Sequence, residues 1–274
     1  MAPLRSAVVT GGAHGIGREI ARRLSARGFA VVVADLDEPA AQQVVADLPG
    51  AGFAHRLDVR DPDGHERVAR VAVEVGPLAV WVNNAGVLQA DKAWTHPVAL
   101  VESTVDVNLK GVIYGCRAAV AAMGGPAAGP ADIINLASMS AWCPTPGLAV
   151  YAATKAAVLS FTTSLAGDLR AAGLSRIRVH ALCPDSVDTT MVRDAAPDED
   201  SWIIFTAPRL LRAEEVADAA LGLLGSRRLV RSLPARRSLL AHVVDLAPSA
   251  AGPLAPLFRR RGNSRRLAAR SGQS

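Results

Sequence analysis

Short apolar runs alternate with longer amphipathic segments through most of this 274-residue chain, and this alternation restricts the fold more than any other feature. The predicted strands are residues 6–10, 30–34, 52–57, 78–82, 132–137 and 176–182. The predicted helices lie near residues 15–27, 39–48, 62–75, 97–123, 151–172 and 213–224. Strands that are apolar nearly throughout, with helices between them, indicate a parallel sheet covered on both faces. Right-handed crossovers then give an α/β, doubly wound, Rossmann-like sheet whose ligand site lies at the carboxyl ends of the strands.

The charge of the chain is unevenly distributed. Residues 1–226 contain 19 Lys and Arg against 24 Asp and Glu, whereas residues 227–274 contain 11 Arg against the single acid Asp245. We therefore predict one dinucleotide-binding and catalytic domain over residues 1–226, followed by a basic C-terminal extension over residues 227–274.

Other features of the composition exclude several classes of protein. No run of 18 uncharged apolar residues occurs, which argues against a membrane-spanning helix, and the first residues do not resemble a secretory signal. The three cysteines are widely spaced, so they predict neither a disulfide framework nor a zinc site, and we expect no metal. These features favour a cytoplasmic protein.

The sequence TGGAHGIG at residues 10–17 joins the first predicted strand to a helix. Glycines here permit a tight turn and a close approach to a pyrophosphate, and the helix N-terminus attracts negative charge. Asp35 ends the second strand, where a carboxylate can bind the ribose hydroxyls and repel a 2′-phosphate. Asp37 reinforces that repulsion, so NAD is favoured over NADP, although a partly charged His14 would have the opposite effect. The alternative for Asp35 is a solvated turn acid.

Two further segments are candidates for chemistry. The NNAG sequence at residues 83–86 closes the fourth strand and is either part of the site or a plain turn. Tyr151 and Lys155 lie one turn apart on one face of a predicted helix, where the ammonium can lower the pKa of the phenol and make it a general acid or base. Ser138 follows the fifth strand, at the expected crevice.

In combination these motifs resemble the short-chain dehydrogenase/reductase family over residues 5 to about 225. The matching pieces are TGGAHGIG (10–17), Asp35, Asp58 with Val59, NNAG (83–86), Asn108, Ser138, YAATK (151–155) and Pro184. The resemblance implies that Tyr151 transfers the proton, Ser138 stabilises the substrate carbonyl, and Lys155 binds the nicotinamide ribose and lowers the Tyr151 pKa. Asn108 is implied to hold a helix kink and a water of the proton relay.

The resemblance also implies a cofactor site and an activity. The implied cofactor-binding residues are Gly11, His14, Gly15, Ile16, Gly17, Asp35, Asp58, Val59, Asn84, Ala85, Gly86, Tyr151, Lys155, Pro184, Val187 and Thr189. We predict an NAD(H)-dependent oxidoreductase acting on a secondary alcohol or ketone. A catalytically silent dinucleotide-binding regulator or scaffold is the alternative. The family also implies a homodimer or homotetramer, whose faces would be the helices near 98–123 and 151–172.

Two departures from the family pattern stand in the C-terminal third of the chain. Asp185 replaces the Gly that usually follows the proline of the turn at Pro184; Asp tolerates a left-handed backbone, but its charge is unusual beside a nicotinamide. Residues 228–233 could form a seventh strand, but no Gly-rich ending follows. The apolar stretch 239–246, flanked by arginines, fits an interfacial helix on a membrane, or a helix packed on the body or on a second subunit. No motif indicates nucleic-acid binding.

Apolar residues also collect beside the predicted site. Met191 and the segment 202–205 form a candidate lid, and Trp142 follows the candidate catalytic serine. The predicted substrate-binding residues are Ser138, Trp142, Tyr151 and Met191. Such a pocket suits an apolar alcohol or ketone, and the alternative is that these side chains only pack the loops.

Overall fold

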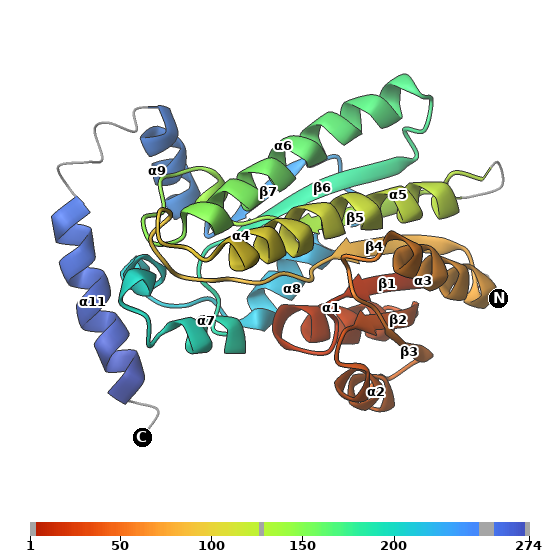
Figure 1. The fold of residues 1–274 in the computed structure, drawn as a ribbon. Coiled ribbons are helices and arrows are strands. Elements are labelled where there is room, and N and C mark those ends of the chain that lie inside the picture. Colours follow the sequence, from red (N-terminus) through yellow and green to blue (C-terminus); the bar gives the residue numbers. More distant parts are fainter. Residues whose placement is uncertain (1–3, 126–128, 247–254, 272–274) are drawn as a thin grey trace.

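A seven-stranded parallel sheet forms the centre of the molecule (Figure 1). The computed structural model describes residues 4–125, 129–246 and 255–271. The strands stand in the order β3-β2-β1-β4-β5-β6-β7. Their bounds are β1 Ser6–Thr10, β2 Ala30–Asp35, β3 Gly52–Arg56, β4 Leu78–Asn83, β5 Ala131–Leu136, β6 Ile177–Pro184 and β7 Val230–Leu233. The predicted doubly wound α/β fold is therefore confirmed.

Two helical layers bury the two faces of this sheet. The helices on one face are α1 (Gly15–Ala26), α2 (Glu38–Ala46) and α8 (Ala213–Leu221), and those on the other are α3 (Pro62–Val75), α5 (Gly111–Met123) and α6 (Ala149–Ala171). Neighbouring strand residues alternate between the layers: Val8 and Ile133 belong to the α3 side, whereas Val9 and Ile134 belong to the α1 side. Burial on both sides explains why these strands are apolar nearly throughout.

The central strand β1 fixes the position of the site. It pairs with β2 on one side and with β4 on the other, and Thr10 at its end lies beside both Ala34 and Asn83. The order in which the strands are added reverses between β1 and β4. The connections that follow these two strands therefore run to opposite sides. A crevice at such a switch point is where doubly wound sheets bind ligands.

The predicted helix over 97–123 consists of three joined segments. Helix α4 (Val98–Val105) continues through a π-helical turn (Asp106–Lys110) into α5. The π turn places Asn108 fully inside the protein. Hydrophobic periodicity predicts the helix but not this wider turn, because one extra residue per turn leaves the overall pattern helical.

The predicted boundary at residue 226 does not separate the sheet from the C-terminal extension. Strand β7 pairs in parallel with β6, as suspected for residues 228–233, so the sheet itself uses part of the basic segment. Helices α9 (Ala235–Leu246) and α11 (Ala255–Ser271) follow β7.

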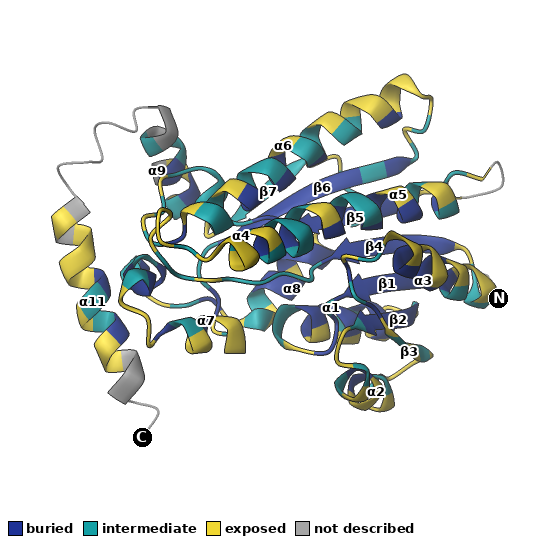
Figure 2. Ribbon diagram, viewed as in Figure 1, coloured by how far each residue is buried: buried dark blue, intermediate teal, exposed yellow. Residues whose placement is uncertain are grey.

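The last helix packs onto the protein body. Helix α11 lies against the 3-10 helix η3 (Glu199–Thr206) of the candidate lid, and a Cβ on Gly262 would clash with the Trp202 carbonyl. Buried residues line this contact, while Arg259 to Arg261 are exposed (Figure 2). Helix α11 is therefore packed on the body, and for the apolar stretch 239–246, which lies in α9, the two alternatives stay predictions. Among the described residues, no helix has both the length and the apolar character needed to cross a bilayer.

Candidate active site

A pocket of about 640 Å³ opens at the carboxyl ends of the strands and extends from the glycine-rich turn to the candidate lid. The predicted cofactor-binding residues that line it are Gly11, His14, Gly15, Ile16, Asp35, Asp58, Val59, Asn84, Ala85, Gly86, Tyr151, Lys155, Pro184, Val187 and Thr189. Its lining also includes Ser138 and Met191. Residues from seven of the eight matching pieces therefore share one cavity.

The glycines of residues 10–17 are required by close backbone contacts. Gly11 and Gly15 have φ angles of +60° and +48°, which side chains rarely tolerate. A Cβ on Gly17 would lie 2.0 Å from the Gly11 carbonyl oxygen, so Gly17 supports the turn from beneath and does not line the pocket. Asn84 donates from its amide to the Gly11 carbonyl at 2.9 Å and so ties the NNAG loop to this turn.

The rim beyond this turn suits a dinucleotide. Helix α1 begins after His14 without a side-chain cap, so no cap side chain occupies its first N–H groups, and Gly15 and Ile16 of its first turn line the pocket. The Asp35 carboxylate accepts from the backbone N–H of Ala13 at 3.0 Å and of Asp37 at 3.1 Å. It stands beside the turn, at the edge where a ribose is expected. These residues fit a nicotinamide dinucleotide.

Arg60 is a pocket residue that the sequence analysis missed. Its guanidinium binds both oxygens of Asp58, with Nε–Oδ1 at 2.9 Å and Nη2–Oδ2 at 2.6 Å, and it holds the Asp58 pKa below its usual range. Asp58 and Arg60 have opposite charges and are two residues apart in the sequence, and this spacing could have predicted their pairing.

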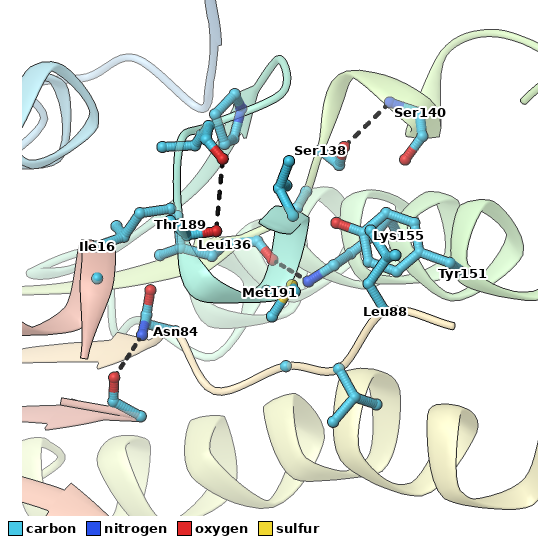
Figure 3. Close-up of a pocket in the computed structure, with 18 of the residues that line it drawn as sticks. Ile16, Asn84, Leu88, Leu136, Ser138, Ser140, Tyr151, Lys155, Thr189 and Met191 are labelled. Carbon is cyan, nitrogen blue, oxygen red and sulfur yellow. Dashed lines mark hydrogen bonds between the residues drawn. The ribbon is translucent and has the colours of Figure 1, made fainter. Parts of the chain in front are cut away.

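Three candidate catalytic side chains converge at the other end of the pocket (Figure 3). Ser138 follows β5, and its hydroxyl oxygen accepts from the Ser140 N–H at 3.2 Å. Tyr151 and Lys155 lie side by side on α6, with the Lys155 Nζ 5.6 Å from the centre of the phenol ring. The Lys155 ammonium donates to the Leu136 carbonyl at 2.8 Å. The helix thus brings the phenol and the cation to the same cavity, as predicted.

The electrostatics of the pair differ from the expectation. Burial raises the pKa of Tyr151 to about 12, and a hydrogen bond with Ser138 opposes the rise. Burial also lowers the pKa of Lys155 to about 8. The predicted lowering of the Tyr151 pKa by Lys155 is therefore not observed in the protein alone, because loss of solvent outweighs an ammonium that points to a carbonyl. A raised pKa keeps the phenol protonated at neutral pH.

Asn108 lies behind the pocket and organises its wall. Its amide oxygen accepts from the Val87 N–H at 2.8 Å, and its amide nitrogen donates to the Val87 carbonyl at 2.9 Å. A weaker bond at 3.3 Å reaches Thr154 on α6. The π turn thereby connects the loop after β4 with the helix that holds Tyr151.

Trp142 does not line this pocket, and its contact with substrate stays a prediction. Its ring instead packs against His242 of α9, with the ring centres 4.1 Å apart. Apolar side chains gather in the part of the pocket that we call the substrate end. They are Leu88, Met139, Leu148, Met191, Val192, Ile203 and Ile204.

Asp185 and Arg237 also line the pocket, at the turn after β6, and the sequence analysis missed Arg237. Their side chains form an ion pair, with Nε–Oδ2 at 2.6 Å. Asp185 does not use the left-handed backbone that was anticipated, since no described residue other than Gly has a positive φ. In the described part of the chain, no three His, Cys, Asp or Glu side chains form a cluster that could hold a metal ion.

Comparisons with known proteins agree with this geometry. The family model for short chain dehydrogenase matches residues 5–200. A probable oxidoreductase, EphD, of Mycobacterium tuberculosis (strain ATCC 25618 / H37Rv) is 31% identical over 258 residues, 88% of this chain. This chain matches only 43% of that relative's length. The 3-beta-hydroxysteroid dehydrogenase of Comamonas testosteroni is 36% identical over 212 residues, covering 76% of this chain and 81% of the relative.

Solved structures share most of this architecture. A short chain dehydrogenase/reductase from Burkholderia phymatum in complex with NAD has a TM-score of 0.82 at 26% identity, covering 90% of this chain and 95% of the other. An actinorhodin polyketide ketoreductase variant with NADPH has a TM-score of 0.75 at 30% identity, covering 84% and 95%. The family match and the shared fold together show that this chain belongs to the short chain dehydrogenase family of oxidoreductases.

Proposed function

We propose that this protein is an NAD(H)-dependent oxidoreductase that transfers hydride between the nicotinamide and an apolar secondary alcohol or ketone. The observation that supports this most directly is the convergence of Ser138, Tyr151 and Lys155 in one pocket with the glycine-rich turn and Asp35. The apolar substrate end fits such an alcohol. The relative named as a hydroxysteroid dehydrogenase is in keeping with that substrate class.

Each catalytic side chain has a distinct task in this proposal. The bound dinucleotide supplies or accepts the hydride. In the direction of reduction, the phenol of Tyr151 donates its proton to the substrate oxygen, and its raised pKa keeps that proton in place until it is needed. The Ser138 hydroxyl donates a hydrogen bond to the same oxygen and stabilises its developing charge. Lys155 provides a nearby positive charge that favours the phenolate left behind.

Asp35 supports NAD as the preferred cofactor. Its carboxylate is fixed by two backbone N–H groups at the rim of the pocket, where it would repel a 2′-phosphate. His14 lies 3.3 Å from Asp37, so a positive charge on His14 would be offset by that carboxylate. We expect the unaltered protein to bind NADH more tightly than NADPH, and Asp35→Ala to narrow the difference by at least tenfold. Tighter binding of NADPH by the unaltered protein would contradict this choice.

The reaction itself is tested with Tyr151→Phe. We expect turnover of a panel of cyclic and aromatic alcohols and ketones to fall by at least a thousandfold, while the fluorescence quenching caused by NADH binding is unchanged. Tyr114→Phe is the matched control, because Tyr114 is the other tyrosine of the chain and does not line the pocket. Full activity in Tyr151→Phe would refute the mechanism. Tight NADH binding with no turnover of any substrate would favour the silent dinucleotide-binding alternative.

We also infer a homodimer or homotetramer in the cytoplasm. Exposed Val98 and Leu100 on α4, one of the predicted interface segments, support the oligomer. Measuring the mass in solution by light scattering tests it, and a monomer at micromolar concentration would reject it. Contact of the extension with a membrane stays a prediction, which liposome co-sedimentation with and without residues 235–274 can decide.

A further inference from the structure

The turn that follows β6 departs from the family pattern at Asp185, and this residue is held from three sides. Its backbone N–H donates to the Leu233 carbonyl at the end of β7 at 2.8 Å. Its Oδ1 accepts from the Ser186 N–H at 2.9 Å, and its Oδ2 meets the Arg237 Nε at 2.6 Å. A carboxylate with only 12% of its side chain exposed needs such partners, because burial otherwise disfavours the charged form.

Arg237 brings the second departure, the C-terminal extension, into the same place. It lies in the first turns of α9, and it is the one pocket-lining residue beyond Thr206 in the described part of the chain. A second contact of α9 supports the same region, because His242 stacks on Trp142 in the loop after Ser138. The extension therefore reaches both the turn after β6 and the loop of the catalytic serine.

We propose that Arg237 is a positioning residue that neutralises Asp185, so that the turn from Pro184 to Val187 keeps the shape that receives the nicotinamide end of the cofactor. The two departures are then one device: the extension supplies the cation that makes an acid tolerable at this turn. This inference rests on the proposed dinucleotide function. Burial raises the pKa of Asp185, and the nearby charge of Arg237 acts in the opposite direction, as the pairing requires.

Removing the cation alone tests this proposal. Arg237→Gln leaves a buried carboxylate unpaired beside the nicotinamide end, and we expect the Kd for NADH to rise at least tenfold. ADP-ribose lacks the nicotinamide ring, so its Kd should stay within twofold of the unaltered protein. This difference between two ligands separates a local effect from a general loss of folding, which would weaken both.

Three further variants sharpen the test. Asp185→Asn combined with Arg237→Gln removes both charges and should return NADH binding to within about threefold, and Arg237→Lys should recover part of it. Arg236→Gln is the matched control, because Arg236 is exposed and does not line the pocket. Its NADH affinity should not change.

Several outcomes would overturn the proposal. Unchanged NADH binding in Arg237→Gln would do so, as would equal weakening of NADH and ADP-ribose, or no recovery in the double variant. If Arg237→Gln does not fold, the double variant decides: weak NADH binding with normal ADP-ribose binding rejects the charge pairing. An unaltered protein that binds no dinucleotide would refute the proposed function itself, and this inference with it.

Discussion

The two ends of the pocket are built by different kinds of contact. At the dinucleotide end, the supporting bonds join loops at the ends of neighbouring strands, as between Asn84 and Gly11 and between Asp35 and Ala13. At the turn after β6 and the candidate lid, they join the body to the C-terminal helices: Arg237 of α9 binds Asp185, and Arg266 of α11 donates to the carbonyls of Ala196, Pro197 and Asp198. The first end depends on the sheet, and the second on the extension.

This difference explains where variation can occur. A pyrophosphate needs backbone N–H groups at fixed positions, so the dinucleotide end requires glycines and tolerates little change. A substrate pocket needs only an apolar lining and a few polar groups, so its support can come from any nearby element. In this protein that element is the pair of helices α9 and α11.

The sharpest test of the dinucleotide end is Gly17→Ala. The added Cβ would lie 2.0 Å from the Gly11 carbonyl oxygen, so the turn must move. We expect NADH affinity, measured by fluorescence quenching, to fall at least a hundredfold. Gly167→Ala is the control, since its Cβ meets nothing within 4 Å; Gly167 lies inside α6, near its C-terminal end, so the alanine should stabilise the protein by about 0.5–1 kcal/mol. Retained NADH affinity in Gly17→Ala would break the contrast between the two ends.

The burial of Tyr151 at the substrate end predicts that its phenol titrates at an unusually high pH. Tyr151 is the remaining tyrosine in Tyr114→Phe, and burial raises its pKa to about 12. Since burial disfavours the charged phenolate, we expect no phenolate absorbance below about pH 10 in a pH titration of this variant. Bound NAD⁺ should move the titration to lower pH, because its positive ring favours the phenolate. Phenolate at pH 8 without cofactor would mean that Lys155 outweighs burial.

The contribution of the extension is measured with Arg266→Met. Only 5% of Arg266 is exposed, and its Nη1 donates to three carbonyls at 3.2–3.3 Å. Leaving these partly buried acceptors without their charged donor should lower the free energy of unfolding by about 2 kcal/mol in urea denaturation. Arg259→Met is the control, because Arg259 is exposed and should cost almost nothing. Equal stability of the two variants would show that the extension does not support the lid.

The sequence predicted the dinucleotide end better than the substrate end, for the same physical reason. Strand residues such as Val8 and Val9 identify the sheet by composition, and the glycine spacing of residues 10–17, between a strand and a helix, predicts a dinucleotide site. The position of Trp142 against His242, and the pairing of Asp185 with Arg237, depend on contacts across many residues that no local pattern encodes. The pKa of Tyr151 likewise depends on burial, which the spacing of Tyr151 and Lys155 does not reveal.

The π-helical turn at Asp106–Lys110 has a consequence for how this segment can change in length. A π turn closes its hydrogen bond over one residue more than an α-helical turn does. Each residue of an α-helix rotates the chain by about 100°. Deleting one residue there would give a continuous α-helix but rotate α4 relative to α5. Either Asn108 would then leave Val87, or Gly115 would leave its tight fit over Asn83. A shortened chain at this point would lose the wall of the pocket while keeping a perfect helix.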